Sequence, residues 1–142
     1  MKKDKDYFVE GSIPAELVAD EIRKHSHKKN IGAHAFFLGQ VRADIIDGKE
    51  VQEIIYSAYT EMANPEFSKI REDAFEKYNL SCLHIYHSIG AVKTGEISLF
   101  VLVSSKHRKD SFDALEDIVE QIKLKVPIWK KEILADGNPN WV

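Results

Sequence analysis

The 142 residues, 44% hydrophobic and 30% charged, have the composition of a globular protein and suffice for one domain with a buried core. The formal net charge of -3 and the isoelectric point near 6.1 argue against general nucleic-acid binding, which requires a basic face. No apolar run approaches the roughly 18 residues that span a bilayer, so we expect no membrane segment. A single cysteine excludes an internal disulfide, and the charged first residues lack a signal-type apolar segment, so we expect a cytoplasmic protein.

Hydrophobic periodicity and turn residues predict five elements in the first half of the chain. They are a short strand at 7–9, a helix opened by Pro14, strands at 33–41 and 51–59, and a helix that begins at Asn64. Asp47-Gly48 has the composition of a hairpin turn, so we expect the strands on either side of it to pair. Asn64-Pro65-Glu66 combines a capping side chain, a fixed φ and an acid near the helix dipole. The polar segment 25–30 is expected to be a loop.

In the second half, strands at 82–89 and 96–104 are joined near Gly90 and Gly95. Ser105 is expected to cap the last helix and Pro127 to end it, because a proline ring cannot donate a backbone hydrogen bond. The helix residues predicted to face the core are Phe112, Leu115, Ile118, Val119 and Ile122. We expect an irregular tail after this helix. Because no repeat or linker interrupts the sequence, we predict a single α+β domain over residues 1–142, with helices packed on a largely antiparallel sheet.

Cations are concentrated in the last third of a chain that is acidic overall. His107 and Arg108 fall in the expected first turn of the last helix, where free backbone N–H groups and the helix dipole favour an anion. These residues are therefore candidate ligands of an anionic group. A solvated basic turn is the alternative, and the two residues alone do not decide between these interpretations.

Three further cations are candidates for a site. Lys123 lies near the end of the last helix, and Lys130 follows Pro127 beside the apolar Trp129. A lysine partly withdrawn from water loses some preference for its charged form and can act as a base or nucleophile. Arg42 follows a core strand and could bind a phosphate. The alternatives are a basic helix end that complements the dipole and an ordinary surface arginine.

The histidines and the cysteine do not form a recognisable metal motif. His84 and His87 are three residues apart on an expected strand and should point to opposite faces. His25 and His27 fall in a lysine-rich segment without a nearby acid or cysteine. Cys82 starts a strand and has no adjacent base, so we expect a buried structural thiol. We therefore expect no metal and no cofactor.

Short motifs in a fixed order make residues 32–142 resemble the large, catalytic subunit of molybdopterin synthase. The motifs are Gly32-Ala33, Phe37-x-Gly39-x-Val41-Arg42, Tyr59-x-x-Met62, His87-x-Ile89-Gly90, Gly95-Glu96, Ser104-Ser105-x-His107-Arg108, Lys123-x-x-x-Pro127-x-Trp129-Lys130-x-Glu132, Asp136-Gly137 and Trp141-Val142. Each motif alone is weak, whereas their order and spacing together are specific.

The resemblance implies an α/β-hammerhead-like fold and a homodimer of large subunits within a heterotetramer. A small ubiquitin-like sulfur-carrier subunit would insert its thiocarboxylated C-terminus into a pocket of each large subunit. The enzyme would then act as a sulfurtransferase that converts cyclic pyranopterin monophosphate to molybdopterin, in molybdenum cofactor biosynthesis. Carried over by motif, Lys123 and Lys130 would be catalytic, and Arg42, His107 and Arg108 would bind the substrate, with some of these residues supplied across the dimer interface.

A second hypothesis assigns the chain to another functional class. It would be a non-catalytic domain of the same fold that binds anions or holds partner proteins together. The lysines at 123 and 130 and Arg42 argue against that alternative. A third hypothesis, a regulatory domain for a small ligand, explains the fold but not the clustered lysines.

Overall fold

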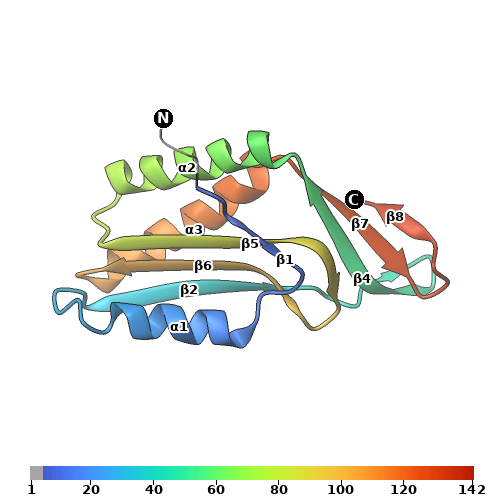
Figure 1. Ribbon diagram of the computed structural model, residues 1–142, viewed down its shortest axis with the longest axis horizontal. Helices are drawn as coiled ribbons and strands as arrows, with labels where there is room; N and C mark the ends of the chain where they lie inside the picture. Colours follow the sequence, from blue (N-terminus) through green and yellow to red (C-terminus); the bar gives the residue numbers. More distant parts are fainter. Residues whose placement is uncertain (1–4) are drawn as a thin grey trace.

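A computed structural model describes residues 5–142, which form three helices packed on an eight-stranded sheet (Figure 1). The strands are β1 (Phe8–Glu10), β2 (Ala33–Gln40), β3 (Ile45–Ile46), β4 (Lys49–Ala58), β5 (Cys82–Lys93), β6 (Ile97–Ser105), β7 (Ile128–Leu134) and β8 (Pro139–Trp141). The helices are α1 (Ala15–His25), α2 (Thr60–Lys77) and α3 (Arg108–Lys125). Every strand pair is antiparallel in the described part except β1 with β5, so the predicted α+β class with a largely antiparallel sheet is confirmed.

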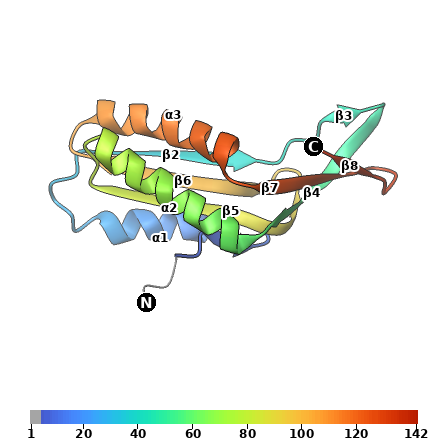
Figure 2. The same cartoon turned by 90° about the horizontal axis from the view of Figure 1, so that it is seen from above.

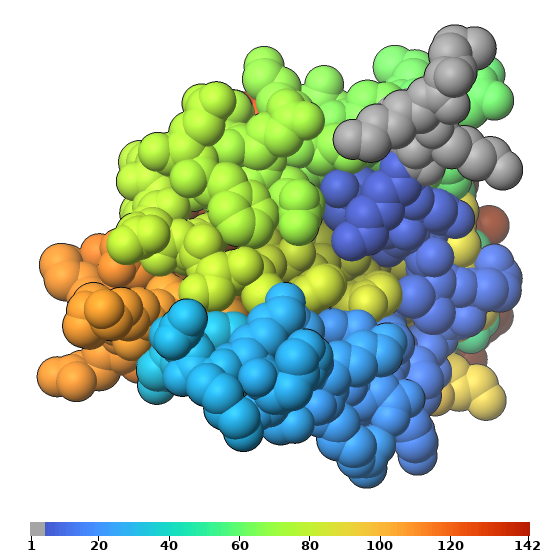
Figure 3. Space-filling view, turned by 60° about the vertical axis from the view of Figure 1, so that its left-hand side comes forward, coloured from blue at the N-terminus to red at the C-terminus, as the bar shows by residue number. Residues whose placement is uncertain are grey.

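The helices cover the two faces of the sheet unequally. The strand order is β2-β6-β5-β4-β7-β8, with α2 and α3 on one side of its first part and α1 on the other (Figure 2). Successive strand residues point to opposite faces of the sheet. Leu83 and Ile85 of β5 therefore join the α2–α3 core, and Phe100 and Leu102 of β6 join the core beneath α1. Between α1 and α2, residues of β5 reach the surface (Figure 3). No helix among residues 5–142 is both long and apolar enough to cross a membrane.

Strand β5 belongs to two parts of the sheet. Its first half pairs with β6 up to His87, and its second half, from Gly90 to Lys93, pairs with β4. The β4, β7 and β8 strands therefore extend away from the helix-covered part of the sheet (Figure 1). Gly90, at the change of partner, has φ 91°, and a Cβ there would lie 2.7 Å from Glu10 Oε1. The backbone conformation favours glycine at this position, whereas the Glu10 side chain could move aside.

The predicted hairpin of strands 33–41 and 51–59 is wrong. Strand β2 pairs with β6, whereas β4 pairs with β5 and β7. Asp47 and Gly48 do form a turn with positive φ, but that turn connects the two-residue strand β3 to the start of β4. The turn residues fix only a local reversal of the chain, and packing of the apolar faces decides which long strands meet.

Both predicted helix starts are shifted. Helix α2 begins at Thr60, and Pro65 lies inside it, where its ring removes one backbone hydrogen bond. The Asn64 side chain accepts a hydrogen bond from the Tyr7 backbone N–H at 3.0 Å and so links α2 to the start of β1 instead of capping a helix. Ser105 ends β6 and donates its hydroxyl to the His107 carbonyl, and α3 starts only at Arg108.

Three other expectations about helices and the chain end need correction. His25, expected in a loop, is the last residue of α1 and is buried. Phe112 lies on the solvent side of α3, with 62% of its surface exposed, although Ile118 and Ile122 are buried as predicted. The segment after Pro127 is not irregular, because it forms β7 and β8.

Phe67 on α2 should contribute strongly to stability. Its ring is fully buried and contacts the rings of Tyr7, Phe8 and His87. We expect Phe67→Ala to lower the free energy of unfolding by about 3–5 kcal/mol, because a cavity remains where the ring was. Phe112→Ala is the matched control on α3 and should change the free energy of unfolding by less than about 0.5 kcal/mol. Urea unfolding of the two variants measures both values, and equal losses would contradict this placement of the core.

Candidate functional site

A pocket of about 570 Å³ opens where the two parts of the sheet meet the end of α3. Its walls come from the end of β2, from the middle of β4, from the last turn of α3 and from β7. The buried residues Val41, Tyr56 and Val92 pack together next to it and form an apolar floor. Three cationic side chains, those of Arg42, Lys123 and Lys130, line this pocket above its apolar floor.

The break at Pro127 brings Lys123 and Lys130 to one pocket. Helix α3 ends at Lys125, and β7 starts at Ile128 immediately after the proline. Because side chains alternate along a strand, Ile128, Lys130 and Glu132 face the pocket. Trp129 does not line the pocket and is half exposed, so the expectation that it forms a wall beside Lys130 is wrong.

Lys130 has an unusual electrostatic environment. Burial is the largest cause that lowers its pKa from the ordinary 10.5, and the positive charges of Lys123 and Arg42 lower it further. Glu132 acts in the opposite direction and raises that pKa. The Glu132 carboxylate also accepts a hydrogen bond from the Asn140 side chain at 2.8 Å, which ties β8 to this wall. A lysine in such surroundings can exchange a proton more readily than a solvated one.

The other two cations of the pocket remain accessible. Arg42 follows β2, and its side chain is 81% exposed, with one guanidinium N–H donated to Asp44 at 3.3 Å. The ammonium of Lys123 lies 5.9 Å from the centre of the Phe37 ring, close enough for a cation–π contact. Both cations are therefore available to an incoming anion, and neither is neutralised by a buried acid.

Two pocket residues, His87 and Tyr56, were not predicted as site residues. Burial lowers the pKa of His87 to about 4, so its imidazole is neutral at pH 7. Its Nδ1 donates to the Ser88 carbonyl at 2.7 Å, and its ring packs edge-on against the ring of Tyr56. Burial also raises the pKa of Tyr56, whose hydroxyl donates to Ser98. In the sequence, only its place in the motif His87-x-Ile89-Gly90 indicated that His87 could belong to the site.

His107 and Arg108 lie at the other end of α3. His107 immediately precedes this helix and Arg108 is its first residue, roughly 22 Å along the helix axis from Lys123. Neither residue lines the pocket. A single chain thus brings together three of the five predicted site residues. The pocket lining has one imidazole and no thiol, so it is not a cysteine-containing metal site.

Comparison with known proteins places this chain in a family. The sequence pattern described as MoaE protein matches residues 13–125. The chain belongs to the MoaE family. The molybdopterin synthase catalytic subunit of Pyrococcus abyssi is 36% identical over 137 residues, which cover 96% of this chain and 85% of that protein.

Solved structures of family members have the same fold. The crystal structure of molybdopterin synthase from Staphylococcus aureus aligns with a TM-score of 0.84 and 33% sequence identity, over 99% of this chain and 98% of the matched chain. A complex of subunits 1 and 2 of the molybdopterin-converting factor from Helicobacter pylori aligns with a TM-score of 0.80. That match has 24% identity and covers 95% of this chain and 88% of the other, so it supports the fold alone.

The coupling between the two lysines is directly measurable. Replacing Lys123 by Gln removes a positive charge that lowers the pKa of Lys130, so this pKa should rise toward 10.5 without reaching it, because burial remains. Lys125→Gln is the control, since Lys125 lines a separate hollow beside α2. NMR titration of the Lys130 side chain measures its pKa in each of the two variants. An equal shift in the two variants would contradict this geometry.

Proposed function

We propose that the chain is the catalytic subunit of molybdopterin synthase. It would transfer sulfur from a thiocarboxylated ubiquitin-like carrier to cyclic pyranopterin monophosphate and so form molybdopterin. The observation that carries this proposal is the pocket that Arg42, Lys123 and Lys130 share. Family membership and 36% identity to a named catalytic subunit support the same conclusion.

The chemistry of the two reactants explains the need for this pocket. The substrate carries a phosphate, and the carrier ends in a thiocarboxylate, so both reactants are anions that cations must hold close together. In the proposal, Lys123 stabilises the negative charge that develops when water attacks the carrier's carbonyl carbon and the carbon–sulfur bond breaks, so that the sulfur stays on the substrate and the carrier leaves as a carboxylate. Lys130, with its lowered pKa, exchanges a proton with the intermediate. The sulfur arrives on the carrier, so the pocket needs no cysteine of its own.

The proposal assigns His107 and Arg108 to the pocket of a second copy of the chain. Their distance from Lys123 along α3 excludes a shared contact with one small substrate within a chain. A homodimer in which α3 of one copy starts near the pocket of the other would complete the cationic site. Edge strand β2 exposes Phe36 and Leu38, which supports an apolar contact between copies. Arg42 would then bind the substrate together with the other copy's residues.

The wider assembly belongs to the same proposal. Two small subunits would bind one dimer of this chain and form a heterotetramer, as the family resemblance implies. We further propose that residues 1–142 act as one domain in the cytoplasm. The single cysteine and the matched span 13–125 support that part of the proposal.

Lys123→Ala separates an enzyme from a scaffold. The variant should fold and bind the carrier but lose at least about a hundredfold in turnover, a typical effect for one catalytic contact. Lys130→Ala should be impaired as well, with more of its loss in substrate affinity. The assay mixes each variant with thiocarboxylated carrier and cyclic pyranopterin monophosphate and measures molybdopterin. Lys125→Ala, outside the pocket, should keep the parent's activity. If all three variants match the parent, the scaffold hypothesis replaces the catalytic one.

Mixing two inactive variants tests the shared site. In the proposal, each pocket takes Lys123 from one copy and Arg108 from the other. In a mixed dimer of Lys123→Ala and Arg108→Ala, one pocket therefore carries both substitutions and the other carries neither. After denaturation and joint refolding, random pairing should restore about a quarter of the parent's activity. Separately refolded variants that are combined only in the assay are the control. No recovery in a mixture that has formed dimers would mean that Arg108 does not contribute across the interface.

A further inference from the structure

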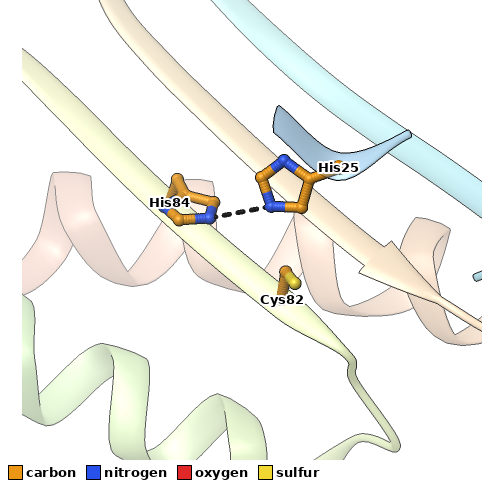
Figure 4. Close-up of side chains that lie close together, drawn as sticks. All are labelled: His25, Cys82 and His84. Atoms are coloured by element: carbon orange, nitrogen blue, oxygen red, sulfur yellow. Dashed lines mark hydrogen bonds between the residues drawn. The ribbon is translucent and has the colours of Figure 1, made fainter. Parts of the chain in front are cut away.

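On the face of the sheet opposite the pocket, three potential metal ligands meet near the end of α1. His25 ends that helix, while Cys82 and His84 point to the same face of β5 because they are two residues apart (Figure 4). The His25 and His84 ring nitrogens and the Cys82 Sγ all lie within 4.8 Å of one another. His84 and His87 do point to opposite faces, as expected, so His87 takes no part in this cluster.

The two imidazoles already have the orientation of metal ligands. His25 Nδ1 donates a hydrogen bond to the Glu21 carbonyl at 2.6 Å, which leaves Nε2 to face His84 Nε2 at 3.1 Å. Hydrogen bonding of the second ring nitrogen to a backbone carbonyl is the usual way in which a metal-binding histidine is held. In a tetrahedral zinc site two ligand nitrogens lie about 3.3 Å apart, and nitrogen and sulfur about 3.6 Å apart. The cluster therefore needs movements of about 1 Å at most to reach that geometry.

The third ligand of the cluster is a buried thiol next to a lysine. Cys82 is buried, and its Sγ accepts a hydrogen bond from the Lys28 ammonium at 3.0 Å. Cys82 is buried as expected, and Lys28 is a neighbour that the sequence did not reveal. Lys28 comes from the loop after α1, so it approaches only in the folded chain.

A buried carboxylate with one unpaired oxygen lies beside the cluster. Glu21 on α1 is only 2% exposed, and its Oε2 accepts no hydrogen bond from any described residue. This atom lies 3.7 Å from His84 Nε2. The other oxygen, Oε1, accepts a hydrogen bond from the Tyr86 hydroxyl at 2.8 Å, which fixes the orientation of the carboxylate. Leaving a buried carboxylate oxygen unpaired is costly, and a cation at this point would remove the cost.

We propose that His25, Cys82 and His84 bind a zinc-type divalent ion, with Glu21 as the fourth ligand. Two imidazole nitrogens, one thiolate and one carboxylate oxygen are all zinc ligand types, and four such ligands complete a tetrahedral site. One thiolate and one carboxylate balance the charge of the ion itself, while the Lys28 ammonium lies beside the cysteine sulfur. The ion would join the end of α1 to the start of β5 and would stabilise the fold without entering the sulfur-transfer pocket.

Cobalt(II) is the probe that tests the site, because its spectrum reports both thiolate ligation and tetrahedral geometry. The full chain, freed of metal with a chelator and kept reduced, is titrated with Co²⁺ and then with Zn²⁺. We expect one equivalent of Co²⁺ to give a thiolate charge-transfer band and tetrahedral visible bands, and Zn²⁺ to abolish both. Zinc should also raise the midpoint of thermal unfolding. A spectrum without the charge-transfer band would overturn the proposal.

Matched variants locate the ion. Cys82→Ser should remove the charge-transfer band, and both it and His84→Gln should weaken Co²⁺ binding at least about a hundredfold, more than loss of an outer partner does. His27→Ala is the control, since His27 is exposed and lies two residues after His25. Circular dichroism checks that each variant folds. Unchanged affinity in a folded Cys82→Ser or His84→Gln variant, or equal loss in His27→Ala, would refute this assignment of ligands.

Discussion

The proline at position 127 is the constraint on which the pocket depends. Its ring cannot continue α3, so the chain leaves the helix at Lys125 and enters β7 at Ile128. The last helical turn and a strand thereby meet at a sharp angle, and each contributes one lysine to the pocket. A longer helix would instead carry the second lysine away from the apolar floor. The lowered pKa of Lys130 follows directly, since burial and a nearby ammonium act on it together.

The central strand β5 separates two chemical environments by side-chain alternation alone. His87 faces the pocket and the core under α2 and α3, whereas Cys82 and His84 face α1. The first environment holds cations ready for anionic reactants. The second holds an unpaired carboxylate oxygen among imidazoles and a thiol, as a bound cation would require. On the proposed assignments, one strand serves the sulfur-transfer pocket on one face and a stabilising metal site on the other.

Much about this chain was predictable from its sequence. The apolar periodicities determined three helices and a largely antiparallel sheet, because burying one face of each element is the dominant requirement of folding. The motifs identified the family, and the resemblance they carry, rather than the positions of Arg42 and Lys123 in their elements, predicted that these cations share a site. Local chemistry also fixed the break at Pro127 and the turn at Asp47-Gly48.

Tertiary structure alone decided which distant segments meet. Turn residues could not show that β2 pairs with β6, since strand pairing depends on which apolar faces pack together. Nor could the sequence reveal that His25 reaches His84 and Cys82 across 57 or more residues, because no short spacing links them. The separation of Arg108 from Lys123 by the length of α3 likewise appeared only in three dimensions. Sequence determined the elements and their chemistry, and long-range packing determined which of those residues share a site.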